Sequence, residues 1–297
     1  QRPVLFAVLP VGVVSGACIS ACAATWPSSA NWGVGCRGTG GWNPRREQFG
    51  ARVPLYGTVV TSIIAIIIAV LVSVGIALFL TELSPGWMRR PLGTAIELLA
   101  AIPSIVYGMW GLLVFAPIFA KYVQPALAAT LGQVPVVGKL FQGAPLGIGI
   151  LSAGVILAIM VIPFIASVMR DVFEVTPPML KESAYALGST TWEVVWNVVL
   201  PYTKVGVTGG IMLGLGRALG ETMAVTFVIG NSPDFSTSLV MPRTSIAATI
   251  AHEFNEATGD MHRSALIALA FVLFIVTFVV LALAQFIDAF LQSLFVV

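Results

Sequence analysis

Charged side chains are scarce in this sequence. Only 9% of its 297 residues are Asp, Glu, Lys or Arg, whereas 58% are hydrophobic; soluble domains carry about 25% charged residues. This scarcity excludes a water-soluble globular domain, and the lack of any basic run argues against nucleic-acid binding. The apolar runs are too long and continuous for the strands of an outer-membrane barrel. The composition therefore predicts an all-α membrane protein.

Cysteine is also rare, and the common nucleotide-binding motif is absent. Cys18, Cys22 and Cys36 lie near the beginning without a second pair to complete a ligand set, so we expect free thiols and no metal site. No G-x-x-x-x-G-K-[ST] sequence occurs that could cradle the phosphates of ATP. We therefore predict a conduit rather than an enzyme, without a cofactor of its own. Active transport would take its energy from another subunit.

Long apolar runs predict about six membrane spans. Residues 1–54 hold a first apolar run that is interrupted by proline and glycine, followed by a loop rich in Gly, Trp and Arg. The run within residues 1–24 fits a span, which we favour, or a cleaved signal sequence, because Ala21-Cys22-Ala23 resembles an A-x-A cleavage site. Residues 55–297 hold five more runs that are long enough to cross a bilayer, and we place them at about 55–81, 92–120, 146–169, 204–230 and 264–290.

The span over residues 92–120 contains a proline and a carboxylate. Pro103 removes a backbone hydrogen bond and should kink the helix. Glu97 lies about one helical turn inside the span, and we expect it to pair with Arg89 or Arg90 at the membrane surface.

The span over residues 204–230 carries an arginine and a glutamate in an apolar run. Arg217 would lie about 20 Å from either end, near the bilayer midplane, where a charge costs roughly 2.5–3.5 kcal/mol on insertion scales. Glu221 follows four residues later, so a continuous helix would place both on one face. The same face holds small residues that allow close helix packing, namely Gly206, Gly210 and Gly214. The pair is either a polar site that contacts the solute on its pathway, which we favour, or a structural ion pair that holds helices together.

Residues 170–203 and 231–263 are long polar loops, and the first predicts two short helices outside the bilayer. Thr176-Pro177 is typical of a helix start, and Gly188 of a helix stop. Thr190 and Glu193 have the spacing of a capping box that opens a second helix, which Leu200-Pro201 should end. A short amphipathic helix on a membrane protein either lies on lipid or docks a partner.

The first loop also carries a family resemblance. Glu182-Ser-Ala184, three residues, Gly188, nine residues and Val198-Val-Leu200-Pro201 resemble the E-A-A-x3-G-x9-I-x-L-P loop of ABC-importer permeases, with Ser183 and Val198 as departures. The resemblance implies a type I importer permease fold whose cytoplasmic coupling helix docks on an ATP-binding subunit. The coupling residues would be Glu182, Ala184, Gly188, Leu200 and Pro201.

Longer segments resemble the C-type permease subunit of phosphate-specific ABC importers. These segments are Pro177–Tyr185, Gly209–Thr226 and Glu97–Gly108, and the resemblance runs from Trp42 to the last span. It implies transport of inorganic phosphate across the inner membrane by a complex with an A-type permease, two ATP-binding subunits that hold ATP and Mg, and an extracytoplasmic phosphate-binding protein. In that family an R-x-x-x-E element of the fifth span serves transport, which falls on Arg217 and Glu221.

Other functions fit the residues without the resemblance. The nearest alternative is a permease for another oxyanion or small solute. An ATP-independent channel or secondary transporter is more distant, because it gives no reason for the loop pattern. A membrane scaffold with a purely structural Arg217–Glu221 pair is the third. The Lys and Arg residues of the loops do not decide the orientation of the chain in the membrane.

Overall fold

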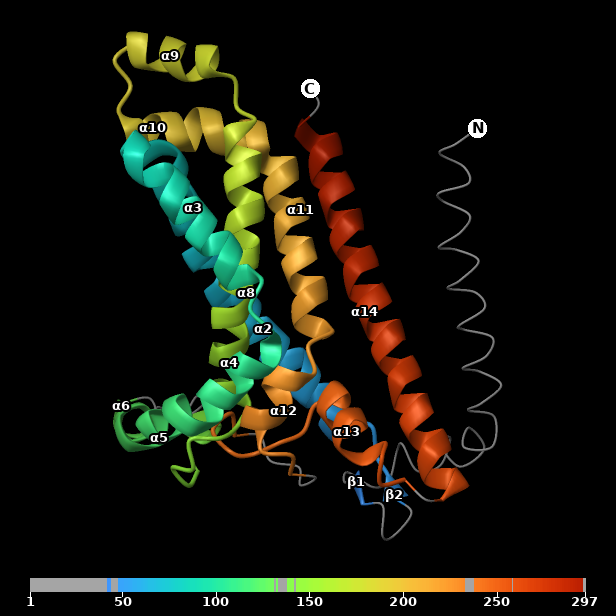
Figure 1. The fold of residues 1–297 in the computed structure, drawn as a ribbon. Coiled ribbons are helices and arrows are strands. Elements are labelled where there is room, and N and C mark those ends of the chain that lie inside the picture. The colour runs from blue at the N-terminus through green and yellow to red at the C-terminus, as the bar shows by residue number, and fades with distance from the viewer. Residues whose placement is uncertain are drawn as a thin grey trace, which may run out of the picture.

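The protein is a bundle of helices with one very short strand pair (Figure 1). The computed structural model describes residues 42–43, 48–130, 132, 138–141, 143–232, 238–257 and 259–295. The predicted first span and all three cysteines lie outside these residues. The strands β1 (Trp42–Asn43) and β2 (Gln48–Phe49) pair antiparallel, with Trp42 opposite Phe49.

Five helices in the described part of the chain are long and apolar enough to cross a membrane. They agree with the all-α membrane fold expected from composition. Their bounds are Arg52–Leu83, Ser104–Thr130, Ile150–Glu174, Thr191–Leu219 and Asp260–Phe286.

Several of these spans combine α-helix with wider π-helical turns, labelled η. The first two spans and the helices around them consist of α2 (Arg52–Leu78), η2 (Phe79–Leu83), α3 (Gly86–Ala100), α4 (Ser104–Trp110), η3 (Gly111–Phe115), α5 (Ala116–Ile118), η4 (Phe119–Val123), α6 (Gln124–Thr130) and α7 (Gly138–Phe141). The rest of the chain forms α8 (Ile150–Glu174), α9 (Pro178–Ala186), α10 (Thr191–Val194), η5 (Val195–Val199), α11 (Leu200–Leu219), α12 (Met223–Ile229), α13 (Ile246–Glu253) and α14 (Asp260–Phe295).

The region expected as one kinked span over 92–120 is two separate helices. α3 ends at Ala100 and α4 begins at Ser104. Pro103 causes the break, because it has no N–H to donate and its ring disfavours a helical conformation at Ile102. The second helix then runs on to Thr130, past residue 120 where the predicted span ended, through the π-turns η3 and η4.

α8 is the central helix of the bundle. In its most apolar stretch 67% of the residues are buried, against at most 28% in the other four spans. Its most extensive partner is α2, and α11 is the next most extensive. The contact with α11 depends on two glycines. A Cβ atom on Gly206 would lie 2.5 Å from a methyl group of Val172, and one on Gly214 would lie 2.4 Å from Ile165. These glycines therefore let α11 and α8 approach closely.

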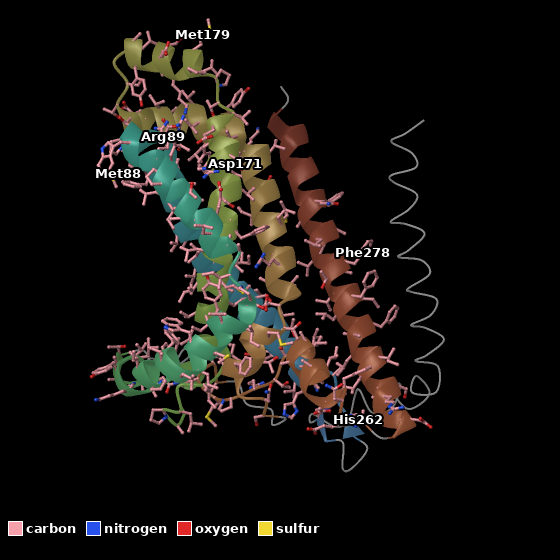
Figure 2. The ribbon with its side chains drawn as sticks, viewed as in Figure 1. Met88, Arg89, Asp171, Met179, His262 and Phe278 are labelled. Atoms are coloured by element: carbon pink, nitrogen blue, oxygen red, sulfur yellow. The ribbon has the colours of Figure 1, made fainter. Side chains whose placement is uncertain are left out.

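The two ends of the bundle differ in structure. α9 and α10 lie across one end, and α13 and the strand pair lie at the other (Figure 1). Figure 2 shows Met179 and Arg89 at the α9 end and His262 at the opposite end. At that opposite end the Glu253 carboxylate accepts a hydrogen bond from the Trp42 indole at 2.7 Å and lies 2.9 Å from His262 Nε2. This cluster joins the strand pair, α13 and the start of α14.

Candidate functional site

The helix that carries Arg217 ends before Glu221. α11 stops at Leu219, and Gly220 to Thr222 are not helical before α12 begins at Met223. The expectation of one continuous helix over 204–230 is therefore wrong at this point. Glycine offers the helix little resistance to ending, because it has no side chain and gains more backbone freedom than any other residue. The break places Arg217 in the last turn of one helix and Glu221 between two helices.

Arg217 is held by an aromatic ring and not by Glu221. Its guanidinium carbon lies 5.2 Å from the centre of the Phe164 ring of α8, the geometry of a cation–π contact. Its Nε atom is buried and has no hydrogen-bond partner among the described residues. A cation in the last turn of a helix also faces the negative end of the helix dipole. The expected ion pair along one helical face is absent from the ion pairs between described residues.

Glu221 lies at a small pocket lined by both hydroxyl and apolar side chains. Its neighbours there include Thr58, Thr61 and Ser62 of α2 and Ser245 at the start of α13. One carboxylate oxygen also accepts a long hydrogen bond, 3.5 Å, from the backbone N–H of Ala224 in the first turn of α12. Arg217 and Glu221 are thus close in the sequence, but their side chains lie in different surroundings: Arg217 beside Phe164 of α8, and Glu221 at the pocket beside α2.

The predicted start and stop signals around α9 are partly correct. The stop is confirmed: Gly188 adopts a left-handed φ of +90° just after α9, a conformation that favours glycine. The capping box is confirmed too, since Glu193 Oε2 accepts from the Thr190 N–H at 2.7 Å and Thr190 Oγ1 accepts from the Glu193 N–H. The cap by Thr176 is wrong. The residue before a proline avoids helical φ/ψ, so Pro177 is extended and α9 begins at Pro178.

The helix after the capping box does not end at Leu200-Pro201. It continues from Thr191 to Leu219 as one hydrogen-bonded helix. Pro201 cannot donate a hydrogen bond, and the π-turn η5 lets the helix pass it, with the Leu200 N–H bonding five residues back to Val195. In Figure 1 the chain crosses the top of the bundle through α10 and then turns down into α11. The joint is a bend within a helix and not a stop.

α9 presents most of its apolar side chains to the outside. It has no buried residue, and Met179 and Leu187, which follows its last residue, are 76% and 88% exposed. Glu182 is exposed as well, whereas Ala184 packs against the edge of the main core. Leu200 packs on the same core from the start of α11. The coupling residues predicted from the sequence therefore divide into an outward group and an inward group.

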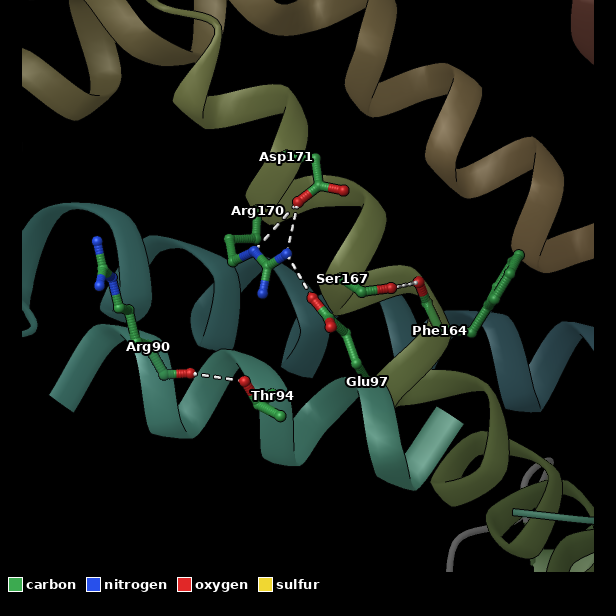
Figure 3. Close-up of polar contacts among 7 residues, drawn as sticks. All are labelled: Arg90, Thr94, Glu97, Phe164, Ser167, Arg170 and Asp171. Carbon is green, nitrogen blue, oxygen red and sulfur yellow. Dashed lines mark hydrogen bonds and ion pairs between the residues drawn. The ribbon is translucent and has the colours of Figure 1, made fainter. Parts of the chain in front are cut away.

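Three ion pairs that the sequence did not predict lie at the α9 end of the bundle. Lys181 of α9 pairs with Glu82 of η2, across 99 positions of the chain. At the end of α8, Arg170 pairs with Glu97 of α3 and with its neighbour Asp171, each at 2.8 Å (Figure 3). Glu97 therefore pairs with Arg170 and not with Arg89 or Arg90 as expected. The nearer arginine in sequence was the wrong choice because α8 runs past α3 and brings Arg170 against it.

The family follows from comparison with known proteins. Residues 69–293 match the family described as binding-protein-dependent transport system inner membrane component. The chain belongs to this family. It is accordingly an inner-membrane component of a transport system, and its apolar helices agree with that location.

The relatives within the family align over most of the chain. The phosphate transport system permease protein PstC of Pasteurella multocida is 57% identical over 285 residues, which cover 96% of this chain and 89% of the relative. PstC of Xylella fastidiosa strain 9a5c is 64% identical over 244 residues, 82% of this chain and 75% of the relative. PstC 1 of Mycobacterium tuberculosis is 41% identical over 232 residues, with coverage of 77% and 68%.

Solved structures show the same fold at low sequence identity. Two inward-facing crystal forms of the MetNI methionine ABC transporter match with TM-scores of 0.53 and 0.56 at 16% identity. The matches cover 77% and 80% of this chain and 92% of the matched chain. The fold is therefore that of an ABC-transporter permease of type I.

Proposed function

We propose that the chain is the permease subunit of an ATP-driven importer and forms half of a pathway for inorganic phosphate across the inner membrane. The observation that carries the substrate is the high identity to phosphate transport system permease proteins over most of the chain. The type I permease fold supports ATP-driven import as the mode of transport.

The proposed assembly follows from what this chain lacks and what it exposes. The sequence has no Walker A motif, so ATP and Mg bind to a separate dimer of ATP-binding subunits. The exposed apolar side chains of α9 provide the docking surface for that dimer on the cytoplasmic side. An A-type permease supplies the other half of the pathway, and an extracytoplasmic phosphate-binding protein delivers phosphate at the α13 end.

The structure supports Arg217 as the phosphate contact in the pathway. An arginine in a membrane helix is costly and marks a solute pathway more often than a structural contact. Here Phe164 stabilises the charge without using the hydrogen-bond donors of the guanidinium, and Nε has no partner among the described residues. A phosphate oxygen is the kind of acceptor that an arginine fork binds best. Glu221, which lies within the break between α11 and α12, neutralises the region when phosphate has left, so that the anion is released.

Phosphate uptake by the reconstituted complex tests this proposal. Vesicles that contain the full complex should take up phosphate only when ATP and the binding protein are present. Arg217→Lys and Glu221→Gln should lower uptake about tenfold or more, since a hydrogen bond to a charged group contributes about 1.5–3 kcal/mol. Arg90→Gln is the matched control, because Arg90 is an exposed arginine outside the proposed pathway; its uptake should equal that of the wild type.

Each rival function predicts a different result in the same vesicles. Uptake of another oxyanion in preference to phosphate would show that this oxyanion, and not phosphate, is the substrate. Phosphate movement without ATP or the ATP-binding subunits would indicate a channel or a secondary transporter. Wild-type uptake by an assembled Arg217→Lys complex would show that Arg217 is structural.

A further inference from the structure

α9 touches the rest of the chain through few groups. None of its residues is buried, and its main neighbours are α10 and η5, which follow it directly in sequence. Lys181–Glu82 is the ion pair that joins α9 to a different span among the described residues. A movement of α9 therefore has two routes into the bundle: along the chain into α11, or across this ion pair into α2.

The ion pair is well shielded from solvent. The side chain of Glu82 is 7% exposed and that of Lys181 is 19% exposed. Salt screens such a pair much less than it screens charges on the surface. The Arg170–Glu97 pair at the same end differs in this respect, because Glu97 is 54% exposed.

Glu82 lies where a carboxylate is unfavourable on its own. It is in η2, the π-turn that ends the helix of α2, with the Ser84 N–H bonded five residues back to Phe79. The end of a helix repels negative charge, because its last carbonyl groups point outward. Arg89 already binds one of these groups, the Thr81 carbonyl, at 2.6 Å. Lys181 provides a positive charge directly beside the Glu82 carboxylate.

α2 connects this ion pair with the pocket at Glu221. Thr58, Thr61 and Ser62 line that pocket, and Glu82 follows on the same continuous helix about 30 Å away at 1.5 Å per residue. α2 packs along α8 more extensively than any other described helix pair. The helix is continuous from Arg52 to Leu83, so a pull at Glu82 is transmitted along its axis to the residues that line the pocket with Glu221.

We propose that the Lys181–Glu82 ion pair transmits the movement of α9 to α2, and through α2 to the pocket at Glu221. The inference rests on the proposed function, because it assigns α9 to the ATP-binding subunits. It adds a second mechanical route beside α11, and it makes Lys181 and Glu82 positioning residues for transport.

The number of phosphate ions moved per ATP hydrolysed tests this role in vesicles that contain the full complex. Lys181→Gln and Glu82→Gln should each lower that ratio by about fivefold or more, the size of a typical coupling between sites. Lys181→Arg keeps the charge and should keep the ratio. Glu97→Gln is the matched control, since it breaks an ion pair at the same end that does not involve α9.

Two double variants separate transmission from simple stability. The reversed pair, Glu82→Lys with Lys181→Glu, should recover much of the ratio. The neutral pair, Glu82→Gln with Lys181→Met, leaves no buried charge without a partner and should assemble well, yet it should stay uncoupled. Both doubles serve the test even if a single variant fails to assemble.

Three results would overturn the inference. They are a wild-type ratio in the assembled single variants, full recovery by the neutral pair, and a loss in Glu97→Gln as large as that in Glu82→Gln. A wild-type complex that shows no ATP-driven phosphate uptake would instead overturn the proposed function, and the inference with it. The wild-type measurement therefore tells the two failures apart.

Discussion

Gly206 and Gly209 lie three residues apart on α11 but meet different surroundings. A Cβ atom on Gly206 would lie 2.5 Å and 2.8 Å from the two methyl groups of Val172, whereas one on Gly209 would meet nothing within 4 Å. Val172 is β-branched and has little freedom to turn away. Gly206→Ala should therefore destabilise the protein by about 1–3 kcal/mol through overpacking.

Gly209→Ala is the matched control for this prediction. Alanine favours a helix over glycine by roughly 0.5–1 kcal/mol, so this variant should be as stable as the wild type or more so. The measurement is the thermal unfolding midpoint of the purified protein in detergent. Equal midpoints for the two variants would show that α11 and α8 do not pack at Gly206 as described.

At the scale of the element, Thr58 joins α2 to α13. Its side-chain oxygen accepts a hydrogen bond from the Ile246 N–H at 2.9 Å in a buried position. That N–H is one of the first in α13, which have no partner within the helix. Thr58→Val keeps the shape but removes the acceptor, so it should destabilise the protein by about 1–3 kcal/mol.

Thr58→Ser keeps the acceptor and separates this effect from packing. It removes one methyl group, which costs about 0.8 kcal/mol. Amide hydrogen exchange at Ile246 should become much faster in Thr58→Val and change little in Thr58→Ser. Unchanged exchange in the valine variant would mean that another group satisfies the Ile246 N–H.

Local signals in the sequence identified some helix ends correctly and misplaced others, such as the stop expected at Leu200-Pro201, and the sequence did not reveal contacts between distant residues. Gly188 and the Thr190–Glu193 box act through residues within one turn of themselves, so their pattern can be recognised in the chain. The helix break at Gly220 has no such signal, because an apolar run with glycine is compatible with a continuous membrane helix. The observed break places Glu221 against α2 and α13, elements that precede or follow it by many residues.

The charged residues show the same limit. Glu97 was assigned to an arginine a few positions away, but its partner Arg170 is 73 residues away and on another helix. Lys181 and Glu82 are 99 residues apart. Only the packing of α8 against α2 and α3 brings such pairs together. Residue types at a candidate site can thus be recognised from the chain, whereas their partners depend on the tertiary structure.

At the scale of the whole molecule, buried contacts between elements hold the α13 end of the bundle, and a short helix without buried residues lies across the α9 end. The α13 end is held by the buried bond between Thr58 and Ile246 and by the Glu253 cluster. The α9 end exposes Met179 and Leu187. Large apolar side chains gathered on a short, exposed helix beyond the spans indicate a surface that another protein covers.

Leu187→Ser tests whether α9 docks the ATP-binding subunits. Leu187 is 88% exposed in this chain alone, and burying a leucine contributes about 1.5–3 kcal/mol. Its loss should weaken the association about tenfold or more, while the unfolding midpoint of the separate chain stays unchanged.

Leu146→Ser controls for the loss of an exposed leucine as such. Leu146 is 52% exposed and precedes α8, so the length of that helix, about 37 Å at 1.5 Å per residue, separates it from α9. The amount of ATP-binding subunit that copurifies with each variant measures the difference. Wild-type copurification with Leu187→Ser, or an equal loss with Leu146→Ser, would place the docking surface elsewhere. If α9 is the docking surface, only the first variant loses the subunit, because only Leu187 lies directly beside α9.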